Sequence, residues 1–188
     1  PASLTYASVV SRESVRIALT YAALNDLEVK TSDVENAFLT APTEERLYTT
    51  LGPEFGEDQG KNATIVRALY GMKSSGAAFR NHLADCMRHL KYVPCPADPD
   101  VWIQEFTKPD GTRYYGYMLL YVDDALCINH KAEEQLRKLD HYFKMKPDSI
   151  GDPNLYLGAK IGAFDVEDNA GRSTSAWGLS PTKYVHSA

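Results

Sequence analysis

Two adjacent aspartates, Asp123 and Asp124, interrupt the otherwise apolar stretch from Leu119 to Ile128. An ionised carboxylate does not enter a protein core unpaired, because its desolvation costs more free energy than neighbouring apolar contacts return. The apolar residues on both sides predict two strands, and the simplest geometry is a hairpin with both aspartates at its tip. One interpretation is purely structural, since aspartate suits turns by accepting hydrogen bonds from nearby backbone amides.

The other interpretation of the aspartate pair is a metal site. Mg²⁺ takes oxygen ligands and often binds through one or two carboxylates plus substrate phosphates. Two such ions, about 3.5–4 Å apart, can activate an attacking oxygen and stabilise the leaving one. Asp33, at the end of a predicted strand that starts near Val29, is the candidate for a further carboxylate. Spacing along the chain does not by itself bring Asp33 to Asp123, so this remains a hypothesis.

The elements that must position these residues follow from periodicity and turn signals. Amphipathic patterns predict helices over 12–28, 75–92 and 131–145, the first capped by Ser11. Strands are predicted over 63–71, 101–106, 113–122, 125–129 and 155–164, with a turn at Pro109–Asp110–Gly111. Residues 40–62, with at most a short strand, and 165–175 read as loops. The mixed order predicts an α+β domain with a mainly antiparallel sheet and not a doubly wound parallel one.

Composition limits the functions that the chain can have. Its 188 residues are 44% hydrophobic and 11% aromatic, enough to bury a core in one domain or two small lobes. No segment approaches the roughly 18 apolar residues of a membrane span. Three separated cysteines argue against a disulfide framework and a zinc ribbon, and favour a reducing compartment. The net charge of −5 weighs mildly against nucleic-acid binding, although an acidic cluster can lie beside a basic face.

The end of the chain carries one more signal. Ser180 followed by Pro181 is typical of a helix N-cap and first helical residue. A helix that begins so near the last residue indicates a piece of a longer protein.

Several ordered blocks, among them YVDD after an apolar strand and DVENAFL upstream of it, resemble the reverse transcriptases of copia-type (pseudovirus) LTR retrotransposon polyproteins. YVDD is similar to their active-site box, and DVENAFL to their upstream aspartate motif. The other blocks are YASVVSRESVRIAL, ALYGMKSSGAAF, ADPDVW, YLGAKI and GLSPTKYV, which extend over nearly the whole chain. The resemblance implies an RNA-directed DNA polymerase, in which a primer 3′-hydroxyl attacks the α-phosphate of a deoxynucleoside triphosphate.

The same resemblance implies roles for individual residues. Asp33, Asp123 and Asp124 would be the catalytic triad and would bind two Mg²⁺ ions (Mn²⁺ as a substitute), with the Val34 carbonyl as a further ligand. Phe38 would be the steric gate that excludes a 2′-hydroxyl. The residues implied in triphosphate binding are Glu35, Asn36, Ala37, Phe38, Tyr70 and Val122. Those implied in template or primer binding are Gly71, Lys73, Tyr121 and the primer-grip residues Tyr156, Leu157 and Gly158.

The resemblance further implies a fold and partners. The expected α+β fold is a right-hand polymerase palm with an antiparallel sheet backed by helices, plus partial fingers and the start of the thumb. The expected boundaries are 1–8 fingers remnant, 9–40 palm, 41–74 fingers, 75–162 palm and 163–188 start of the thumb. The implied partners are an RNA template, a DNA or tRNA primer, dNTPs, and the integrase and RNase H domains of the same polyprotein, with no membrane. The expected location is a cytoplasmic virus-like particle, with the product imported into the nucleus.

One block departs from the family pattern, which reads roughly LYGLKQSPRAW. Ser74, Gly76, Ala77 and Phe79 stand in place of its glutamine, proline, arginine and tryptophan. Arginine can bind a phosphate bidentately, so its replacement predicts a weaker grip on the template. Two alternatives stay open: a degenerate, non-catalytic domain that binds RNA or protein, and an unrelated metal-dependent phosphohydrolase that uses Asp33 and the aspartate pair.

Overall fold

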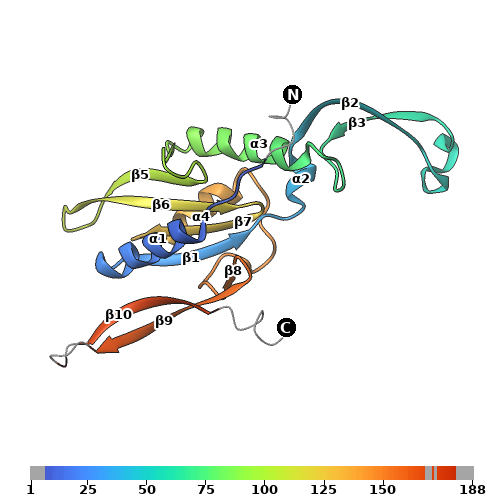
Figure 1. Ribbon diagram of the computed structural model, residues 1–188. Coiled ribbons are helices and arrows are strands. Elements are labelled where there is room, and N and C mark those ends of the chain that lie inside the picture. The colour runs from blue at the N-terminus through green and yellow to red at the C-terminus, as the bar shows by residue number, and fades with distance from the viewer. Residues whose placement is uncertain (1–6, 168–170, 172, 181–188) are drawn as a thin grey trace. The chain divides into compact units, whose positions relative to one another are not determined.

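The computed structural model describes residues 7–167, 171 and 173–180, and the chain divides into two compact units (Figure 1). Of the described residues, the first unit contains Ala7 and 36–85, and the second contains 8–35, 86–167, 171 and 173–180. No helix in the described ranges has both the length and the apolar character needed to cross a membrane.

A five-stranded antiparallel sheet forms the centre of the second unit, in the order β1-β7-β6-β5-β4. Its strands are β1 (Glu28–Asp33), β4 (Val93–Pro94), β5 (Val101–Thr107), β6 (Arg113–Tyr121) and β7 (Asp124–Asn129). β5, β6 and β7 follow one another as hairpins, whereas β1 comes from far earlier in the chain and pairs with β7. The predicted antiparallel sheet and its hairpins are therefore confirmed.

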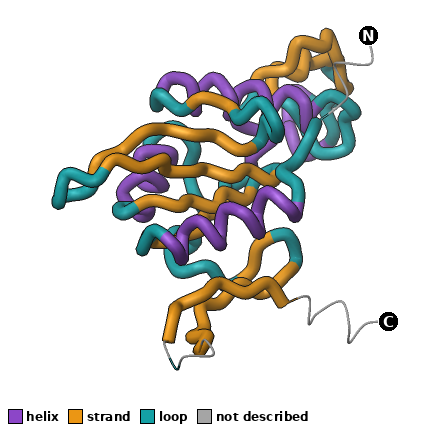
Figure 2. Tube along the Cα trace, turned by 60° about the vertical axis from the view of Figure 1, so that its left-hand side comes forward, coloured by secondary structure: helices purple, strands orange, loops and turns teal. Residues whose placement is uncertain are grey.

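Helix α1 (Arg12–Leu24) covers one face of this sheet (Figure 2). Its buried residues, Val15, Ala18, Leu19 and Ala22, have helical spacing and pack with Leu119, Leu126 and Ile128 of the strands. Ser11 caps the helix as predicted, because its Oγ accepts a hydrogen bond from the Ser14 N–H at 3.1 Å. The Asp98 carboxylate accepts hydrogen bonds from the Ser11 N–H and the Ser14 hydroxyl, at 3.0 and 2.6 Å, and so ties the cap to the chain before β5.

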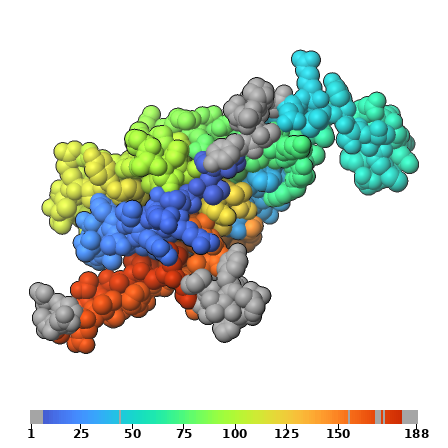
Figure 3. Space-filling model, viewed as in Figure 1, coloured from blue at the N-terminus to red at the C-terminus, as the bar shows by residue number. Residues whose placement is uncertain are grey.

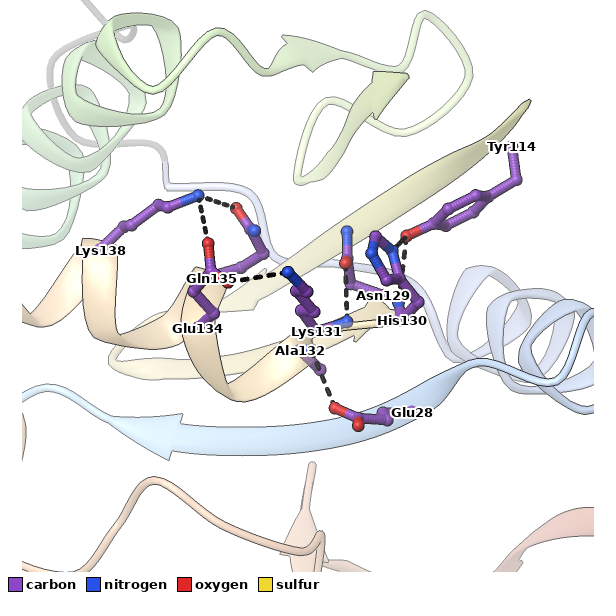
Figure 4. Close-up of polar contacts among 9 residues, drawn as sticks. All are labelled: Glu28, Tyr114, Asn129, His130, Lys131, Ala132, Glu134, Gln135 and Lys138. Carbon is purple, nitrogen blue, oxygen red and sulfur yellow. Dashed lines mark hydrogen bonds and ion pairs between the residues drawn. The ribbon is translucent and has the colours of Figure 1, made fainter. Parts of the chain in front are cut away.

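Helix α4 (Ala132–Asp140) packs against β7 and β1 through Leu136 and Leu139, and its N-terminus is held by side chains outside the helix. The first N–H groups of a helix have no partner within it. Glu28 of β1 accepts a hydrogen bond from the Ala132 N–H at 3.1 Å, and Asn129 Oδ1 accepts one from the Lys131 N–H at 2.9 Å (Figure 4). The Glu28 carboxylate also interacts favourably with the helix dipole. These contacts attach the N-terminus of α4 to β1 and to the end of β7.

A smaller antiparallel sheet of β8 (Leu155–Tyr156), β9 (Ala159–Glu167) and β10 (Ser173–Ser180) completes the second unit. Ile161, Trp177 and Leu179 join the hydrophobic cluster of α1, and Figure 3 shows that helix in blue beside the orange and red strands. The single strand predicted over 155–164 was wrong, because Leu157 and Gly158 form a tight turn with φ of 54° and 70°. The loop predicted over 165–175 was also wrong in extent, because β9 continues to Glu167 and β10 begins at Ser173. Both strands are largely exposed in this range and carry no apolar alternation there that would have predicted them.

Ser180 is the last residue of β10, and the predicted helix from Pro181 lies outside the described residues. The predicted cap role of Ser180 therefore concerns residues whose structure is not described.

The first unit contains α2 (Ala37–Thr40), β2 (Pro42–Thr50), the 3₁₀ helix η2 (Pro53–Asp58) and β3 (Asn62–Arg67). Helix α3 (Ser75–His89) starts in this unit, and its last turn belongs to the second. β2 and β3 form an antiparallel pair, so the loop predicted over 40–62 was wrong for β2, a nine-residue strand. The side chains of β2 are mostly exposed, so its sequence lacks the apolar alternation that would have predicted a strand. The strand predicted up to Gly71 ends at Arg67.

Replacing Gly116 of β6 by alanine should destabilise the second unit. An added Cβ would lie 2.6 Å from Asn129 Nδ2 and 2.8 Å from the Phe106 ring, and Asn129 is fully buried. We expect Gly116→Ala to lower the free energy of unfolding by about 1–3 kcal/mol, measured by chemical denaturation. Gly162→Ala in β9 is the matched control, because nothing lies within 4 Å of its added Cβ. Equal losses in the two variants would contradict this account of the packing.

Candidate active site

The three predicted aspartates meet at one end of the five-stranded sheet. Asp33, the last residue of β1, lies opposite Asp124, the first residue of β7. Directly opposed residues of an antiparallel pair direct their side chains to the same face. The Val34 N–H donates a hydrogen bond to the Asp123 carbonyl at 2.9 Å, so the end of β1 also holds the turn that contains Asp123. Residues about 90 positions apart along the chain thus form one acidic cluster.

The turn between β6 and β7 consists of two residues, Val122 and Asp123, and is closed by Tyr121 opposite Asp124. The prediction that both aspartates lie at the tip was therefore wrong for Asp124, which begins the strand. Val122 has a φ of 53°, in the left-handed region that a β-branched residue rarely adopts. Such a conformation costs about 1–3 kcal/mol and is typical of functional sites.

The side chains of Asp123 and Asp124 do not make the contacts that a purely structural turn role requires. Asp110, in the turn between β5 and β6, provides a comparison, since its Oδ1 accepts a hydrogen bond from the Thr112 N–H at 2.9 Å. Among the described residues, Asp123 and Asp124 have no such side-chain hydrogen bond. Their carboxylate oxygens are therefore available for a ligand.

Burial and neighbouring negative charges both disfavour the ionised form of Asp124. Burial, together with the nearby charges of Asp123 and Asp33, raises the pKa of Asp124 to about 6. Lys146 opposes this shift, and its Nζ lies 2.6 Å from Asp33 Oδ2. The hydrogen bond to Asp33 in turn raises the pKa of Lys146. A single ammonium therefore offsets part of the charge of three carboxylates.

The oxygen atoms at this end of the sheet are of the type that binds a hard divalent cation. Asp33 Oδ1 is buried and has no hydrogen-bond partner. Val34 pairs with Met145 through the carbonyls of Asp33 and Lys144, so the Val34 carbonyl is not used in that pairing. Carboxylate and carbonyl oxygens are the ligands that Mg²⁺ and Mn²⁺ prefer. Within the described ranges, however, no three acidic, histidine or cysteine side chains already converge as a metal cage.

Two lysines beside the site, Lys144 and Lys146, were missed by the sequence analysis. After α4 the chain returns antiparallel to the end of β1, and the Lys146 N–H donates to the Asp33 carbonyl at 2.8 Å. The Glu35 N–H donates to the Lys144 carbonyl at 2.8 Å, and Lys144 Nζ lies 2.5 Å from Glu35 Oε2. The alternation Lys-Met-Lys over 144–146 could have indicated an extended segment. The strand that this segment pairs with, β1, could not be identified from spacing along the chain.

The predicted primer-grip residues form the turn between β8 and β9. Tyr156 is fully buried, and its Oη donates a hydrogen bond to the Leu119 carbonyl of β6 at 3.0 Å. Burial raises the pKa of Tyr156 well above its ordinary value, so the phenol remains a donor. Within this hairpin Tyr156 is buried and Leu157 is half-buried. This turn is thus attached to the strand that leads into Val122 and Asp123.

The remaining predicted residues lie in the first unit and include an aromatic cluster. The half-buried Phe38 ring lies 4.8 Å from the Tyr70 ring and 6.2 Å from the Phe79 ring, between centroids. Asn36, just before α2, has a left-handed conformation with a φ of 50°, and Ala37 is buried. The other predicted residues, Gly71 and Lys73, are exposed.

A cleft of about 300 Å³ lies in the first unit, between the start of β2 and the first turns of α3. Ser74 and Ala77 line it, and these are two of the positions that depart from the family pattern. Ser74 Oγ is buried and has no hydrogen-bond partner. Small side chains thus border open space where that pattern has glutamine and arginine.

Comparison with known proteins defines the class of protein. Residues 3–169 match the family described as "Reverse transcriptase (RNA-dependent DNA polymerase)", and the chain therefore belongs to that family. It is 32% identical over 187 residues to the "Retrovirus-related Pol polyprotein from transposon TNT 1-94" of Nicotiana tabacum, covering 96% of this chain and 13% of that protein. The predicted reverse transcriptase domain of a copia-type retrotransposon polyprotein is thereby confirmed.

Two further relatives come from Arabidopsis thaliana. The Pol polyprotein from transposon RE1 is 28% identical over 128 residues, which cover 67% of this chain and 8% of that protein. The Pol polyprotein from transposon RE2 is 27% identical over 147 residues, which cover 76% of this chain and 10% of that protein. The chain thus spans only a small part of the curated relatives that it matches.

Removing the charge of Asp124 should stabilise the fold at neutral pH. Because the folded-state pKa is raised to about 6 from 3.8, the folded protein binds this proton more tightly than the unfolded chain does. The carboxylate therefore destabilises the fold above pH 6, and the penalty disappears as the pH falls through 6 towards 3.8. We expect Asp124→Asn to raise the free energy of unfolding at pH 7.5 by about 1–2 kcal/mol, a value reduced for solvent screening.

Chemical denaturation between pH 4 and 7.5 measures this effect, and the gain should shrink with falling pH. Asp110→Asn is a control of opposite sign, because hydrogen bonds from Thr112 lower the pKa of Asp110. A loss of stability in Asp124→Asn at pH 7.5 would contradict the repulsion inferred for the cluster.

Proposed function

We propose that this chain is the palm, with part of the fingers and the start of the thumb, of an RNA-directed DNA polymerase of a copia-type retrotransposon. The observation that carries the proposal is the register that sets Asp33 opposite Asp124, with Asp123 in the adjoining turn and its carboxylate free of backbone contacts. The proposed palm, residues 9–40 and 75–162, overlaps largely with the second unit. The proposed fingers, residues 41–74, lie in the first unit, and residues 163–188 would begin the thumb.

In this proposal Asp33, Asp123, Asp124 and the Val34 carbonyl hold two Mg²⁺ ions, with Mn²⁺ as a substitute. Bound there, such ions would neutralise triphosphate charge and promote ionisation of the primer 3′-hydroxyl. The chain contributes rigid placement, because Asp33 and Asp124 stand on paired strands and the Val34 N–H fixes the Asp123 carbonyl. Fixed charges in a partly buried site stabilise developing charge better than mobile solvent does.

The primer end is assigned to the turn between β8 and β9 and to Tyr121. Tyr156 binds the Leu119 carbonyl, so Leu157 and Gly158 are attached to the same strand that carries Tyr121. A shared strand can keep the primer end and the acidic cluster in a constant relation, which in-line attack requires.

The incoming nucleotide is assigned to Glu35, Asn36, Ala37, Phe38, Tyr70 and Val122, and the template to Gly71 and Lys73. Phe38 would be the gate against a 2′-hydroxyl, and its contacts with the Tyr70 and Phe79 rings support this role by restricting the ring. The full set of partners would be an RNA template, a DNA or tRNA primer, dNTPs, and the integrase and RNase H domains of one polyprotein. The proposed location is a cytoplasmic virus-like particle, from which the product enters the nucleus.

A second candidate function is a degenerate domain that binds RNA or protein without catalysis. The cleft bordered by Ser74 and Ala77 favours this candidate, because a phosphate-binding arginine is replaced there by a small side chain. Primer-dependent synthesis separates the two candidates.

Primer extension on an RNA template with dNTPs and Mg²⁺ or Mn²⁺ tests the proposal. We expect the chain to extend the primer and Asp123→Asn to reduce the rate by at least about 100-fold, because a charge that stabilises the transition state is lost. Asp110→Asn, in the turn at the other end of β6, is the matched control and should keep the rate. Equal extension by wild type and Asp123→Asn would remove the catalytic assignment. If the chain alone is inactive, the same variants should be compared with the flanking polyprotein segments attached.

The gate assignment has its own test. Phe38→Val should increase ribonucleotide incorporation relative to deoxyribonucleotide incorporation by about tenfold or more, because a smaller side chain leaves room for a 2′-hydroxyl. Single-nucleotide extension with dNTPs and NTPs measures the ratio of kcat/KM values. Leu39→Val, on the same short helix but exposed, is the control. Unchanged discrimination in Phe38→Val would reject the gate role.

A further inference from the structure

We propose that Lys146 is a tethered competitor of the divalent metal: its ammonium binds Asp33 in the metal-free protein and must leave when the metal binds. Lys146 would thus set the metal affinity of the site. The inference rests on the proposed function, since it takes Asp33 to be a metal ligand.

The position of the ammonium supports competition at one carboxylate. Lys146 Nζ lies 2.6 Å from Asp33 Oδ2 and donates a hydrogen bond to it, while Asp33 Oδ1 is buried and has no partner. The charges of Asp123 and Asp124 also act on Lys146. The ammonium therefore lies where the negative charge of the cluster is concentrated, which is also where a cation would be attracted.

The backbone keeps Lys146 at this place. Its N–H donates to the Asp33 carbonyl at 2.8 Å, and the neighbouring Met145 pairs with Val34. Ser149 adds a second connection, because its hydroxyl lies 3.3 Å from both the Asp33 N–H nitrogen and the Asp33 carbonyl. A tethered group competes at a high effective concentration, without any need for tight intrinsic binding.

The side chain of Lys146 can move away although its backbone cannot. About half of the side chain, 48%, is exposed, so the ammonium can turn into solvent on its flexible stem. A divalent cation on Asp33 would repel an ammonium in hydrogen-bond contact with the same carboxylate. In this proposal the metal and the Lys146 ammonium therefore do not occupy Asp33 at the same time.

Lys144 offers a matched control on the same segment. Its Nζ lies 2.5 Å from Glu35 Oε2, so it pairs with a carboxylate beside the triad and not with a member of it. Lys144→Gln and Lys146→Gln remove the same charge two residues apart. A general electrostatic effect would act in both variants, whereas direct competition would act only through Lys146.

The test is a Mn²⁺ titration of the 188-residue chain, with free ion measured by electron paramagnetic resonance. We expect Lys146→Gln to bind Mn²⁺ about three- to fivefold more tightly than wild type, in line with the modest strength of an exposed ion pair. Lys144→Gln should change the affinity less than about twofold, because its partner is not a proposed metal ligand. Lys146→Arg keeps the competing cation and should bind no more tightly than wild type. Circular dichroism confirms folding of each variant.

A second measurement reports on Lys146 directly. Nitrogen NMR of the lysine ammonium groups should show the Lys146 signal in its ion-paired state without metal, and its loss on addition of Mg²⁺. The Lys144 signal should persist through the same titration.

The outcomes separate this inference from the proposed function. Equal tightening in both lysine variants, or none in Lys146→Gln while Asp33→Asn abolishes binding, would overturn the competition and keep the metal site. Unchanged Mn²⁺ binding in both Asp33→Asn and Asp123→Asn would reject the metal site itself, and the inference with it.

Discussion

Six residue pairs join β1 to β7, from Glu28 opposite Asn129 to Asp33 opposite Asp124, and the geometry of the acidic cluster depends on this pairing. A slip of one residue would move every side chain of β1 to the other face of the sheet and separate Asp33 from Asp124. The register is fixed by burial, because Val29 of β1 and Ile128 of β7 are partners within the core that α1 covers. Hydrophobic packing on one face thus determines where charged groups meet at the end of the sheet.

The acidic cluster itself works against folding. Burial and two neighbouring charges disfavour the ionised form of Asp124, and Val122 holds a backbone conformation that suits glycine better than valine. The turn at Asp110 shows that this protein can reverse a β-hairpin with an aspartate that bonds to its backbone. The turn between β6 and β7 lacks that stabilisation, because the carboxylates of Asp123 and Asp124 accept no such hydrogen bond from the described backbone. A ligand therefore explains these residues better than stability does.

Local patterns were sufficient for the elements that bury an apolar face. The stripe of α1, its cap at Ser11, and the succession of β5, β6 and β7 were predictable because each depends on neighbouring residues. The strands β2 and β10 and the part of β9 after Phe164 were not, since their exposed side chains lack the alternation that a half-buried strand shows. Asp33 could be named as a candidate because it ends a strand. Its pairing with Asp124 and with Lys146 depends on contacts between distant segments, which spacing does not reveal.

The departures from the family pattern and the acidic cluster lie in different units of the chain. All four departing residues, Ser74, Gly76, Ala77 and Phe79, belong to the first unit, whereas the carboxylates and their lysines belong to the second. Loss of an arginine from the first unit leaves every hydrogen bond and ion pair of the acidic cluster in place. Under the proposed function, binding of metal and binding of template would therefore be separable properties, and weak polymerisation would not by itself argue against an intact metal site. If the carboxylates bind metal as proposed, the metal affinity would report on the second unit alone, and it would be a more direct test of their role than polymerisation.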